Sequence, residues 1–373
     1  MYKQSKIPNS VKPYNTERLY QLWKEEYFDL LDHVLQGKTF DGEYTIKTQN
    51  EIKRRTGRKH CWLTPSGTSA LMVATLSGFI GPGDEVIAPN YGYVASVNQM
   101  LAAGAKLKFV DVDKFGHIDV NKIEDQITHK TKALVVVGLY GDAPNMDRIE
   151  QIAKDNNLYL INDAAQCSMS TYNDRVVDSY GDTSIISFGA NKHISTFATY
   201  GAILTDDEEL AYRIERVRLN GKTGRDKTVE FVGMNAQSHE DKAVQCWLAL
   251  KYFDQWQTRR HQIADYYDSR FAEAGVNFRA VAPNCKSVRQ KYPVFFKSKY
   301  KAYDKILEEG VETQTHYIDN FATGVFNHQK NINERYPGTE YHNQHSLSIP
   351  MQAFLTDAEV ERVVEAVIKH KGE

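Results

Sequence analysis

The residues Leu158-Tyr-Leu-Ile-Asn-Asp-Ala-Ala-Gln166 predict a buried β-strand that ends in a carboxylate, Asp163. A second run, Ser184-Ile-Ile-Ser-Phe-Gly-Ala-Asn-Lys-His193, predicts another buried strand that leads into a short polar loop carrying Lys192. Ligands of open α/β sheets bind in the crevice beyond the carboxyl ends of the parallel strands. We therefore expect Asp163 and Lys192 to lie in one ligand-binding crevice.

Similar apolar runs alternate with helical patterns through the first two thirds of the chain. Continuous apolar runs that are separated by helices indicate strands buried on both faces of a largely parallel sheet. One helix is expected after Asp142, because Ile149, Ile152 and Ala153 fall on one stripe. The fold class is therefore α/β, with a mostly parallel central sheet flanked by helices. The further strands are expected at residues 85–89, 106–111, 132–137 and 201–204.

The pattern changes near Gly233, which indicates a second domain. Helical segments fill residues 240–274, and short strands and helices follow, with a strand at 292–296 and helices at 301–309 and 357–370. We predict an N-terminal segment and large domain over residues 1–239 and a small α+β domain over residues 240–373. The first sixty residues are expected to pack on both the large and the small domain.

Composition and charge exclude several classes of protein. The 373 residues are 41% hydrophobic and 25% charged with a formal net charge of -2, which fits an ordinary globular protein. Lysine and arginine (46) nearly balance aspartate and glutamate (48), so nucleic acid is not an expected partner. The short basic clusters at 53–55 and 58–59 are expected to form a solvated helix face.

No membrane or secretion signal is expected. The apolar runs, such as residues 133–139, are far shorter than the roughly 20 residues that span a bilayer, and no apolar segment follows Met1 as in a signal peptide. The cysteines have no CxxC spacing, which argues against a zinc site or a redox dithiol. We expect a cytoplasmic, reduced protein without a metal; its cysteines are Cys61, Cys167, Cys246 and Cys285.

A third motif, Thr64-Pro-Ser-Gly-Thr-Ser-Ala-Leu71, predicts a turn that runs into an apolar helix. Gly67 permits a close approach of the backbone, and Thr68 and Ser69 place hydroxyls beside the free amides of a helix N-terminus, which suits a phosphate. An ordinary N-cap is the alternative interpretation of this motif. Likewise, Asp163 could simply cap the next segment, and Lys192 could be a surface charge.

The order of the three motifs favours pyridoxal phosphate (PLP). This cofactor needs a phosphate site, a carboxylate that keeps its pyridine nitrogen protonated, and a lysine amine for its aldehyde. Lys192 at the end of an apolar strand is expected to be partly desolvated, which lowers the pKa of its amine and makes the amine more nucleophilic. A nicotinamide enzyme would need a GxGxxG run after its first strand, and the sequence has none.

With these motifs the sequence resembles the DegT/DnrJ/EryC1/StrS family of sugar aminotransferases over nearly its whole length. The resemblance implies the fold-type I aminotransferase architecture, with PLP as cofactor. The stretches that carry it are Ser66-Gly-Thr-Ser-Ala-Leu71, Gly81-Pro-Gly-Asp-Glu-Val-Ile-Ala-Pro89, Val110-Asp-Val-Asp113, Leu139-Tyr-Gly141, Asp163-Ala-Ala-Gln166, Ser187-Phe188 with Lys192, Thr205-Asp-Asp-Glu-Glu-Leu210, Gly233-Met-Asn235, Thr315-His-Tyr317 and Leu347-Ser-Ile-Pro350.

The resemblance also implies a role for individual residues. Lys192 would carry the cofactor as a Schiff base and shuttle the proton between cofactor and substrate carbons. Asp163 would pair with the pyridinium nitrogen. The remaining assignments are Gln166 on the hydroxyl side of the ring, Gly67, Thr68 and Ser187 at the phosphate, Tyr93 stacked on the ring with Tyr91 in the core or at the lip, Asn235 reaching the phosphate of the neighbouring subunit, and His316 with Tyr317 at the sugar-nucleotide cleft.

The implied reaction moves an amino group from L-glutamate to a keto-sugar linked to a nucleoside diphosphate. The expected acceptor is a dTDP- or UDP-linked 4-keto or 3-keto-6-deoxy sugar, made for a surface polysaccharide or a natural product. Because Asn235 would act across subunits, a homodimer with shared active sites is expected.

Three positions depart from the family pattern. Gln237 stands where relatives often have an arginine, so a partner for a carboxylate or phosphate is missing. Residues 198–201 replace a loop that is commonly acidic and add a bulky tyrosine, so an unusual acceptor is possible. Asn162 replaces a common glutamate, with little effect expected.

Three other functions stay open on the sequence. A sugar dehydratase of the same family would have histidine in place of Lys192, although His193 is adjacent. An aminotransferase for another cyclic ketone, such as a keto-inositol, would fit the altered loop. A cofactor-binding sensor without turnover is the third alternative.

Overall fold

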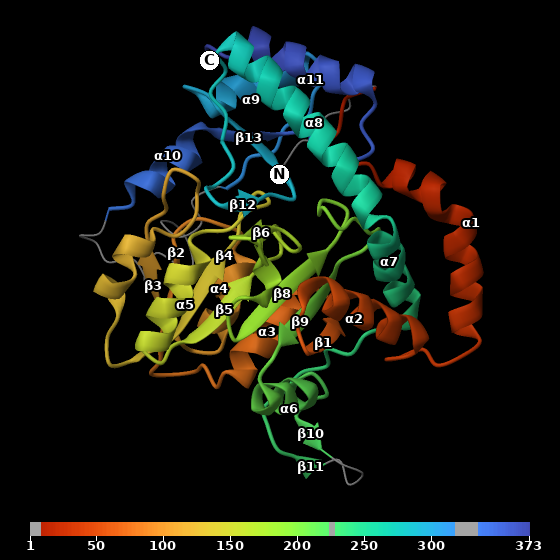
Figure 1. Cartoon of the computed structure of the whole chain (residues 1–373), viewed down its shortest axis with the longest axis vertical. Helices are drawn as coiled ribbons and strands as arrows, with labels where there is room; N and C mark the ends of the chain where they lie inside the picture. Colours follow the sequence, from red (N-terminus) through yellow and green to blue (C-terminus); the bar gives the residue numbers. More distant parts are fainter. Residues whose placement is uncertain (1–8, 224–227, 318–334) are drawn as a thin grey trace.

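The structure is a computed structural model that describes residues 9–223, 228–317 and 335–373. A seven-stranded sheet forms its centre, and helices pack on the sheet (Figure 1). The strand order is β1-β9-β8-β5-β4-β2-β3, and only β9 runs antiparallel to its neighbours. The strands are β1 (His60–Thr64), β2 (Glu85–Pro89), β3 (Lys106–Val110), β4 (Thr131–Val137), β5 (Tyr159–Asp163), β8 (Thr183–Phe188) and β9 (Tyr200–Thr205).

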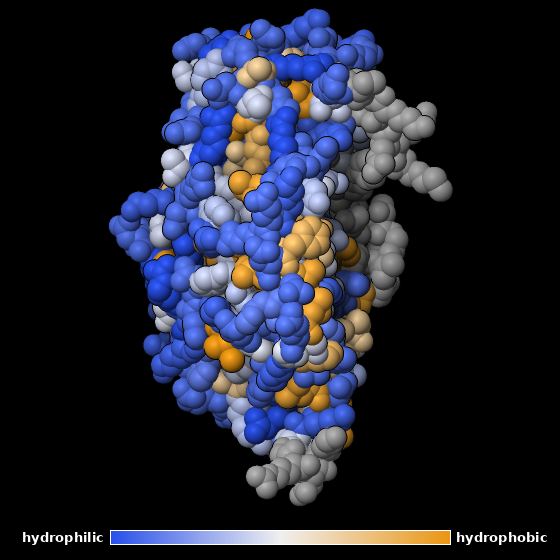
Figure 2. Space-filling view, turned by 90° about the vertical axis from the view of Figure 1, so that its right-hand side faces the viewer, coloured by the Kyte–Doolittle hydropathy of each residue, from blue (hydrophilic) through white to orange (hydrophobic). Residues whose placement is uncertain are grey.

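Two N-terminal helices, α1 (Thr16–Leu35) and α2 (Glu43–Thr56), pack with α7 (Glu240–Lys251) along one side of the sheet. Trp23 of α1 and Ile52 of α2 are fully buried, in one apolar cluster with residues of β8 and β9. The outer side of α1 is different, because Leu22, Phe28 and Leu35 are about half exposed. Figure 2 faces this side of the molecule and shows hydrophobic side chains gathered in its middle and lower parts, among hydrophilic ones.

The helix α2 begins without a side-chain cap of its own. Instead the buried carboxylate of Glu240, at the start of α7, accepts hydrogen bonds from the backbone N–H groups of Gly42, Tyr44 and Thr45 at 2.8–3.0 Å. A carboxylate is stabilised at a helix N-terminus by the free amides and the helix dipole. This contact joins the N-terminal segment to α7, which is nearly 200 positions away in the sequence.

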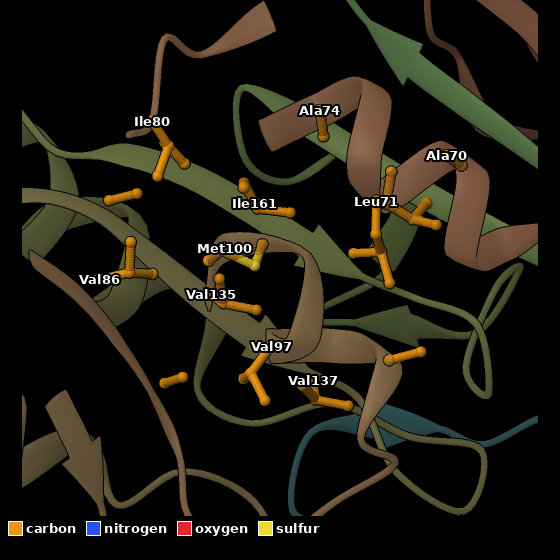
Figure 3. Close-up of a cluster of buried hydrophobic side chains, with 14 of the residues drawn as sticks. Ala70, Leu71, Ala74, Ile80, Val86, Val97, Met100, Val135, Val137 and Ile161 are labelled. Atoms are coloured by element: carbon orange, nitrogen blue, oxygen red, sulfur yellow. The ribbon is translucent and has the colours of Figure 1, made fainter. Parts of the chain in front are cut away.

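The apolar runs form strands that are buried on both faces, as predicted. In β4, Ala133, Val135 and Val137 point to one cluster, while Leu134 and Val136 point to another on the opposite face. This alternation follows from the two-residue period of a strand. Figure 3 shows the first cluster, where α3 (Gly67–Ser77) and α4 (Ala95–Ala102) cover Val135, Val137 and Ile161. Each such buried side chain contributes about 1.5–3 kcal/mol by removal from water.

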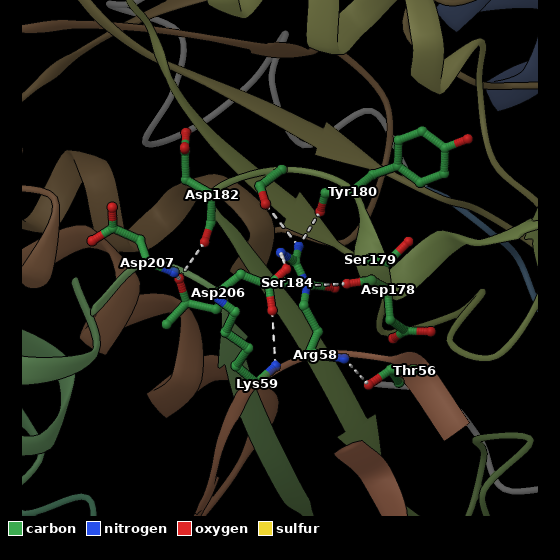
Figure 4. A network of polar contacts seen from close by, with 12 residues as sticks. Thr56, Arg58, Lys59, Asp178, Ser179, Tyr180, Asp182, Ser184, Asp206 and Asp207 are labelled. Atoms are coloured by element: carbon green, nitrogen blue, oxygen red, sulfur yellow. Dashed lines mark hydrogen bonds and ion pairs between the residues drawn. The ribbon is translucent and has the colours of Figure 1, made fainter. Parts of the chain in front are cut away.

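Lys59 is exposed, as the sequence suggested, but Arg58 does not belong to a solvated face. Arg58 is 5% exposed, and its guanidinium donates to the main-chain oxygens of Asp178, Tyr180 and Gly181 and pairs with Asp206 at 2.9 Å (Figure 4). Five donors in one planar group can satisfy several carbonyls at once, which explains an arginine in this buried place. The prediction holds for Arg54, whose side chain is 65% exposed and pairs with Glu51 in the same helix.

The chain from α8 (Phe253–Ala274) onward builds a separate apolar cluster on a two-stranded antiparallel sheet. Val11 joins this cluster through a bridge to Val311, so the N-terminal segment contacts both parts of the molecule. The boundary that the sequence predicts at residue 240 stays a prediction, since α7 packs with α1 and α2. The elements are β13 (Tyr292–Phe295), α9 (Lys299–Glu308), α10 (Pro337–His345), β14 (Ser346–Ile349) and α11 (Asp357–Lys369), which starts with a capping box.

A buried ion pair joins the C-terminal part to the loop that follows β4 of the central sheet. Asp142 accepts two hydrogen bonds from the guanidinium of Arg279, at 2.6 and 3.0 Å, and a third from the N–H of Ala282 at 2.9 Å. The adjacent residues Tyr140 and Gly141 accept main-chain hydrogen bonds from Lys291 and Val288. The segment that carries Lys291 is therefore tied to the loop after β4.

The remaining elements lie at the periphery of the sheet, and the α/β prediction with a mostly parallel sheet is confirmed. Within the described ranges, no helix combines the length and apolar character needed to cross a membrane. These peripheral elements are α5 (Met146–Asp155), α6 (Glu208–Val217), β6 (Thr171–Tyr172), β7 (Arg175–Val176), β10 (Lys222–Thr223), β11 (Thr228–Val229), β12 (Cys285–Lys286) and the 3₁₀ turns Val120–Lys122, Glu124–Gln126 and Val177–Ser179.

Candidate active site

A cavity of about 420 Å³ lies beyond the ends of β4, β5 and β8. The start of α3, the segment before α4, and residues 290–291 and 315–317 from the C-terminal part complete its wall. Asn235 does not line the cavity and is exposed. Ser69 and Tyr91 do not line it either. The predicted site residues that do line it are Gly67, Thr68, Tyr93, Asp163, Gln166, Ser187, Lys192, His316 and Tyr317.

One end of the cavity is the N-terminus of α3. Ser66 caps this helix by accepting from the N–H of Ser69 at 3.0 Å, which leaves the first amides of the helix for a ligand. The packing here is close, since a Cβ on Gly67 would lie 3.1 Å from the Cβ of Ser187. Gly201 of β9 is even more constrained, because a Cβ there would lie 2.5 Å from the carbonyl of Ser66. Two glycines therefore shape an anion site of the kind that binds phosphate.

Asp163 ends β5 and is 4% exposed. Its carboxylate accepts a hydrogen bond from the Ser96 hydroxyl at 2.6 Å and another from the N–H of Ala165 at 3.1 Å. Burial raises the pKa of Asp163, and the Ser96 bond and the positive charge of Lys192 offset this only in part. In the described parts of the chain this carboxylate has no ion-pair partner within 4 Å, so a cationic group of a ligand would fit here.

Lys192 follows β8 and presents its amine to the cavity. The main-chain N–H of Lys192 donates to the carbonyl of Gly189 at 3.0 Å, and the Ser195 hydroxyl donates to the main-chain carbonyl of Lys192 at 2.7 Å. These two hydrogen bonds fix the loop. Burial lowers the pKa of the Lys192 amine, although Asp163 acts in the opposite direction. The amine is therefore neutral over a wider pH range than that of an exposed lysine, as a nucleophile requires.

The neighbouring His193 does not share this position. Its ring is fully buried, contacts Phe253 and lies 2.9 Å from the carbonyl of Ser168. Burial lowers the pKa of His193 to about 3, so the ring is neutral. It belongs to the core and does not line the cavity.

A cluster of buried tyrosines, here called the tyrosine wall (Tyr91, Tyr140 and Tyr317), supports residues 316–317, and of the three Tyr317 lines the cavity. The Tyr91 and Tyr140 hydroxyls lie 2.7 Å apart, and both are within hydrogen-bonding distance of the carbonyl of His316. Because each hydroxyl has one proton, one donates to this carbonyl and the other donates to its neighbouring hydroxyl. The N–H of Tyr317 donates to the Tyr91 hydroxyl at 2.9 Å, and Gln166 donates to the Tyr317 hydroxyl. Tyr91 is thus a core residue, as expected, and it positions the segment that carries His316 and Tyr317.

Two tyrosines that the sequence places near the substrate lie in different environments: Tyr93 is exposed, whereas Tyr200 is buried. Tyr93 is 56% exposed at the cavity mouth, where a ring can stack on a flat ligand. The bulky tyrosine expected beside the substrate is buried, because Tyr200 lies in β9 and packs in the cluster behind the sheet. The residue of this loop that lines the cavity is Thr199.

Sequence reasoning missed several residues of the site. No role was predicted for Ser96, and Gly201 was predicted only to end the loop 198–201 and to begin a strand. A glycine inside a strand pattern often marks a close backbone approach, so Gly201 carried a usable signal. Gln290 and Lys291 had none, since they precede a short strand far along the chain and reach the cavity only through the packing of the C-terminal part.

The arrangement fits PLP. The α3 N-terminus suits a phosphate, the buried carboxylate of Asp163 suits a protonated pyridine nitrogen, and the amine of Lys192 lies at the same cavity to form an imine with an aldehyde. The site holds one carboxylate and two lysines among its described lining residues, which leaves it able to bind an anionic substrate.

Comparison with known proteins agrees with this chemistry. The model of the DegT/DnrJ/EryC1/StrS aminotransferase family matches residues 21–368. A dTDP-3-amino-3,6-dideoxy-alpha-D-galactopyranose transaminase of Aneurinibacillus thermoaerophilus is 33% identical over 316 residues, which are 84% of this chain and 86% of that protein.

Two solved structures are similar throughout. One is S. venezuelae DesV in complex with a ketimine intermediate, with a TM-score of 0.92, 27% identity, and coverage of 96% of this chain and 98% of that chain. The other is NtdA of Bacillus subtilis with bound cofactor PMP, with a TM-score of 0.88, 28% identity, and coverage of 96% and 85%.

Proposed function

The chain belongs to the DegT/DnrJ/EryC1/StrS aminotransferase family, and on that premise we propose that it is a PLP-dependent transaminase for nucleotide-linked keto-sugars. The observation that carries the proposal is that Asp163, Lys192 and the N-terminus of α3 meet at one cavity. These three groups match the ring nitrogen, the aldehyde and the phosphate of PLP.

The assignments of the other residues follow from their places at the cavity. Gly67, Thr68 and Ser187 would hold the phosphate, and Tyr93 would cover the ring face. Gln166 would contact the ring hydroxyl, since it points to the same wall as Tyr317. His316 and Tyr317 would border the sugar.

When bound, PLP supplies an electron sink that stabilises negative charge at the substrate carbon. Asp163, oriented by Ser96, would keep the ring nitrogen protonated and so maintain that sink. Lys192 would move the proton between the substrate carbon and the cofactor carbon, because it lines the cavity and burial lowers the pKa of its amine. The buried tyrosine wall would exclude water behind His316 and Tyr317.

The proposed donor is L-glutamate, and the proposed acceptor is a keto-sugar on a nucleoside diphosphate. The proposed carrier is dTDP or UDP, and the A. thermoaerophilus relative, which is named for a dTDP-linked amino sugar, supports dTDP. A dehydratase is disfavoured, since Lys192 is present and His193 is buried away from the cavity. A keto-inositol acceptor was suggested by the altered loop at 198–201 with its bulky tyrosine. This suggestion is weakened, because Tyr200 is buried in an apolar cluster and does not line the cavity.

We also propose a homodimer in the cytoplasm. Asn235 is exposed and away from the cavity of its own chain, which suits contact with the phosphate of a neighbouring subunit. Exposed apolar side chains on and near the N-terminal helices would be buried in such an interface: Tyr20, Leu22, Phe28, Leu35, Phe40 and Ile46. Light scattering should give twice the chain mass, and Asn235→Ala should weaken PLP binding without loss of the fold.

The decisive test is covalent capture of the cofactor. Purified protein with PLP should show the visible absorbance of lysine-bound PLP, and borohydride should fix the cofactor on Lys192. Peptide mapping would distinguish Lys192 from Lys291, which lines the same cavity. Added L-glutamate should convert the absorbance to that of the pyridoxamine form, and a panel of dTDP- and UDP-keto-sugars with mass detection should identify the acceptor.

Lys192→Ala should abolish turnover, whereas Lys286→Ala at a surface lysine that is 78% exposed should leave it unchanged. A colourless wild-type protein with PLP, or capture at another lysine, would refute the proposal.

A further inference from the structure

We propose that Lys291 binds a carboxylate of the amino donor in the active-site cavity. This inference rests on the proposed function and deepens it, because it assigns a cation to the donor where the family arginine is replaced by Gln237. Gln237 itself does not line the cavity. The inference therefore concerns a group that lies elsewhere in the sequence and reaches the site from the C-terminal part.

The geometry places Lys291 in the same cavity as Lys192. Its main-chain N–H donates to the carbonyl of Tyr140 at 3.2 Å, which fixes the backbone at the tyrosine wall. Its amine donates one hydrogen bond to Oε1 of Gln314 at 3.1 Å. A lysine ammonium has three donors, so others are left for a ligand.

The two charged side chains that act on the amine of Lys291 are both cations. Lys192 and the buried Arg260 are its charged neighbours, and His316 is the nearby titratable ring. Within the described ranges, Arg260 donates to the main-chain oxygens of Arg289 and Met351, and its buried Nε has no hydrogen-bond partner there. Among the ion pairs of the described residues, neither Lys291 nor Arg260 has a carboxylate partner.

An excess of buried positive charge at a ligand cavity calls for an anion. The carboxylate that lines the cavity, Asp163, is engaged by Ser96 and Ala165 and is assigned to the cofactor ring. Once Lys192 is bonded to the cofactor, Lys291 is the lysine that remains among the described lining residues. The donor amino acid brings the anion, because it carries a carboxylate next to its reacting carbon.

Burial lowers the pKa of Lys291 to about 7, and the charges of Lys192 and Arg260 act in the same direction. A bound carboxylate would raise this pKa again, since it favours the charged amine. Binding therefore takes up a proton above about pH 7, and the affinity for a carboxylate should fall by up to tenfold for each further pH unit. An arginine in this place would remain charged and would not show this fall.

The test uses glutarate, a dicarboxylate without an amine, as a probe that binds without reacting. Its dissociation constant is measured on the PLP-loaded enzyme from pH 6.5 to 8.5. Wild type should lose affinity above pH 7. Lys291→Gln should bind glutarate at least tenfold more weakly at pH 6.5 and show no further fall, whereas Lys291→Arg should bind at all these pH values. Lys286→Gln is the matched control, because its lysine pairs only with exposed Asp174.

A second readout separates binding from chemistry. In single-turnover conversion of the cofactor absorbance, Lys291→Gln should raise the L-glutamate concentration at half-maximal rate and change the maximal rate little. Unchanged glutarate affinity in Lys291→Gln would overturn the inference, as would a loss confined to the maximal rate or to the binding of dTDP or UDP. If wild type forms no lysine-bound PLP, the proposed function fails first, so the two failures are distinguishable.

Discussion

Replacement of Asp142 by asparagine tests how the site is held together. Both side chains of the Asp142–Arg279 pair are almost completely buried, with exposures of 0% and 4%. Asparagine keeps the shape of the side chain but removes its charge. The guanidinium of Arg279, which also donates to the carbonyl of Phe115 at 2.7 Å, would then be a buried cation without a carboxylate.

The expected loss of folding stability is large for a substitution that keeps the shape of the side chain. Breaking a buried, fully hydrogen-bonded ion pair by removing one partner costs about 3–5 kcal/mol. The N–H of Ala282 would also keep only a weaker acceptor. By contrast, the exposed pair of Lys286 and Asp174, with 78% and 81% exposure, should contribute at most about 1 kcal/mol.

The assay is the free energy of unfolding from urea titration of wild type, Asp142→Asn, Arg279→Gln, the double variant and Asp174→Asn. The double variant should be less destabilised than the sum of the single variants, because the two side chains interact directly. A loss below about 1 kcal/mol in Asp142→Asn, equal to that of the surface control, would refute the reasoning.

The same pair predicts an acid dependence with a definite sign. Burial alone would raise the pKa of Asp142, but Arg279 and His117 hold this pKa well below its ordinary value of 3.8. A depressed pKa in the folded state contributes stability above the ordinary pKa, and this stability is lost as the pH falls toward the lower value. Wild type should therefore lose stability below about pH 4 more steeply than Asp142→Asn does.

The remaining predictions concern the cofactor site. Asp163→Asn should still bind PLP but lose most of its transamination rate, because a neutral amide does not keep the ring nitrogen protonated; steady-state kinetics check this, and an unchanged rate would exclude the role. Gly201→Ala should weaken PLP binding with little change in helix content, since the added Cβ collides with the Ser66 carbonyl; titration of the apo protein with PLP measures the effect. Because burial lowers the pKa of Lys192, the rate of PLP attachment should rise with pH and level off below pH 10.5, and a rise that continues past that value would contradict it.

Local pattern determined the fold class of this protein and the residues that line its cavity from the central sheet. Short apolar runs that alternate with helical patterns are typical of buried parallel strands, and a strand that ends in Asp163 places this residue at the carboxyl end of such a sheet. Lys192 and the turn at Ser66–Gly67 were predictable for the same reason, since each directly follows an element that local sequence specifies. A polar residue directly after an apolar run therefore indicates a residue at the ligand-binding end of the sheet.

Only the tertiary structure decided which distant side chains complete and support that centre. Lys291 reaches the cavity because Asp142 and Arg279 join two segments more than a hundred positions apart, and Glu240 caps α2 across a similar span. Arg58 and Tyr200 are buried although their local sequence suggested solvent or substrate contact. Burial of a charge or a ring depends on what packs against it, and that partner is set by the folded chain as a whole and not by neighbours in sequence.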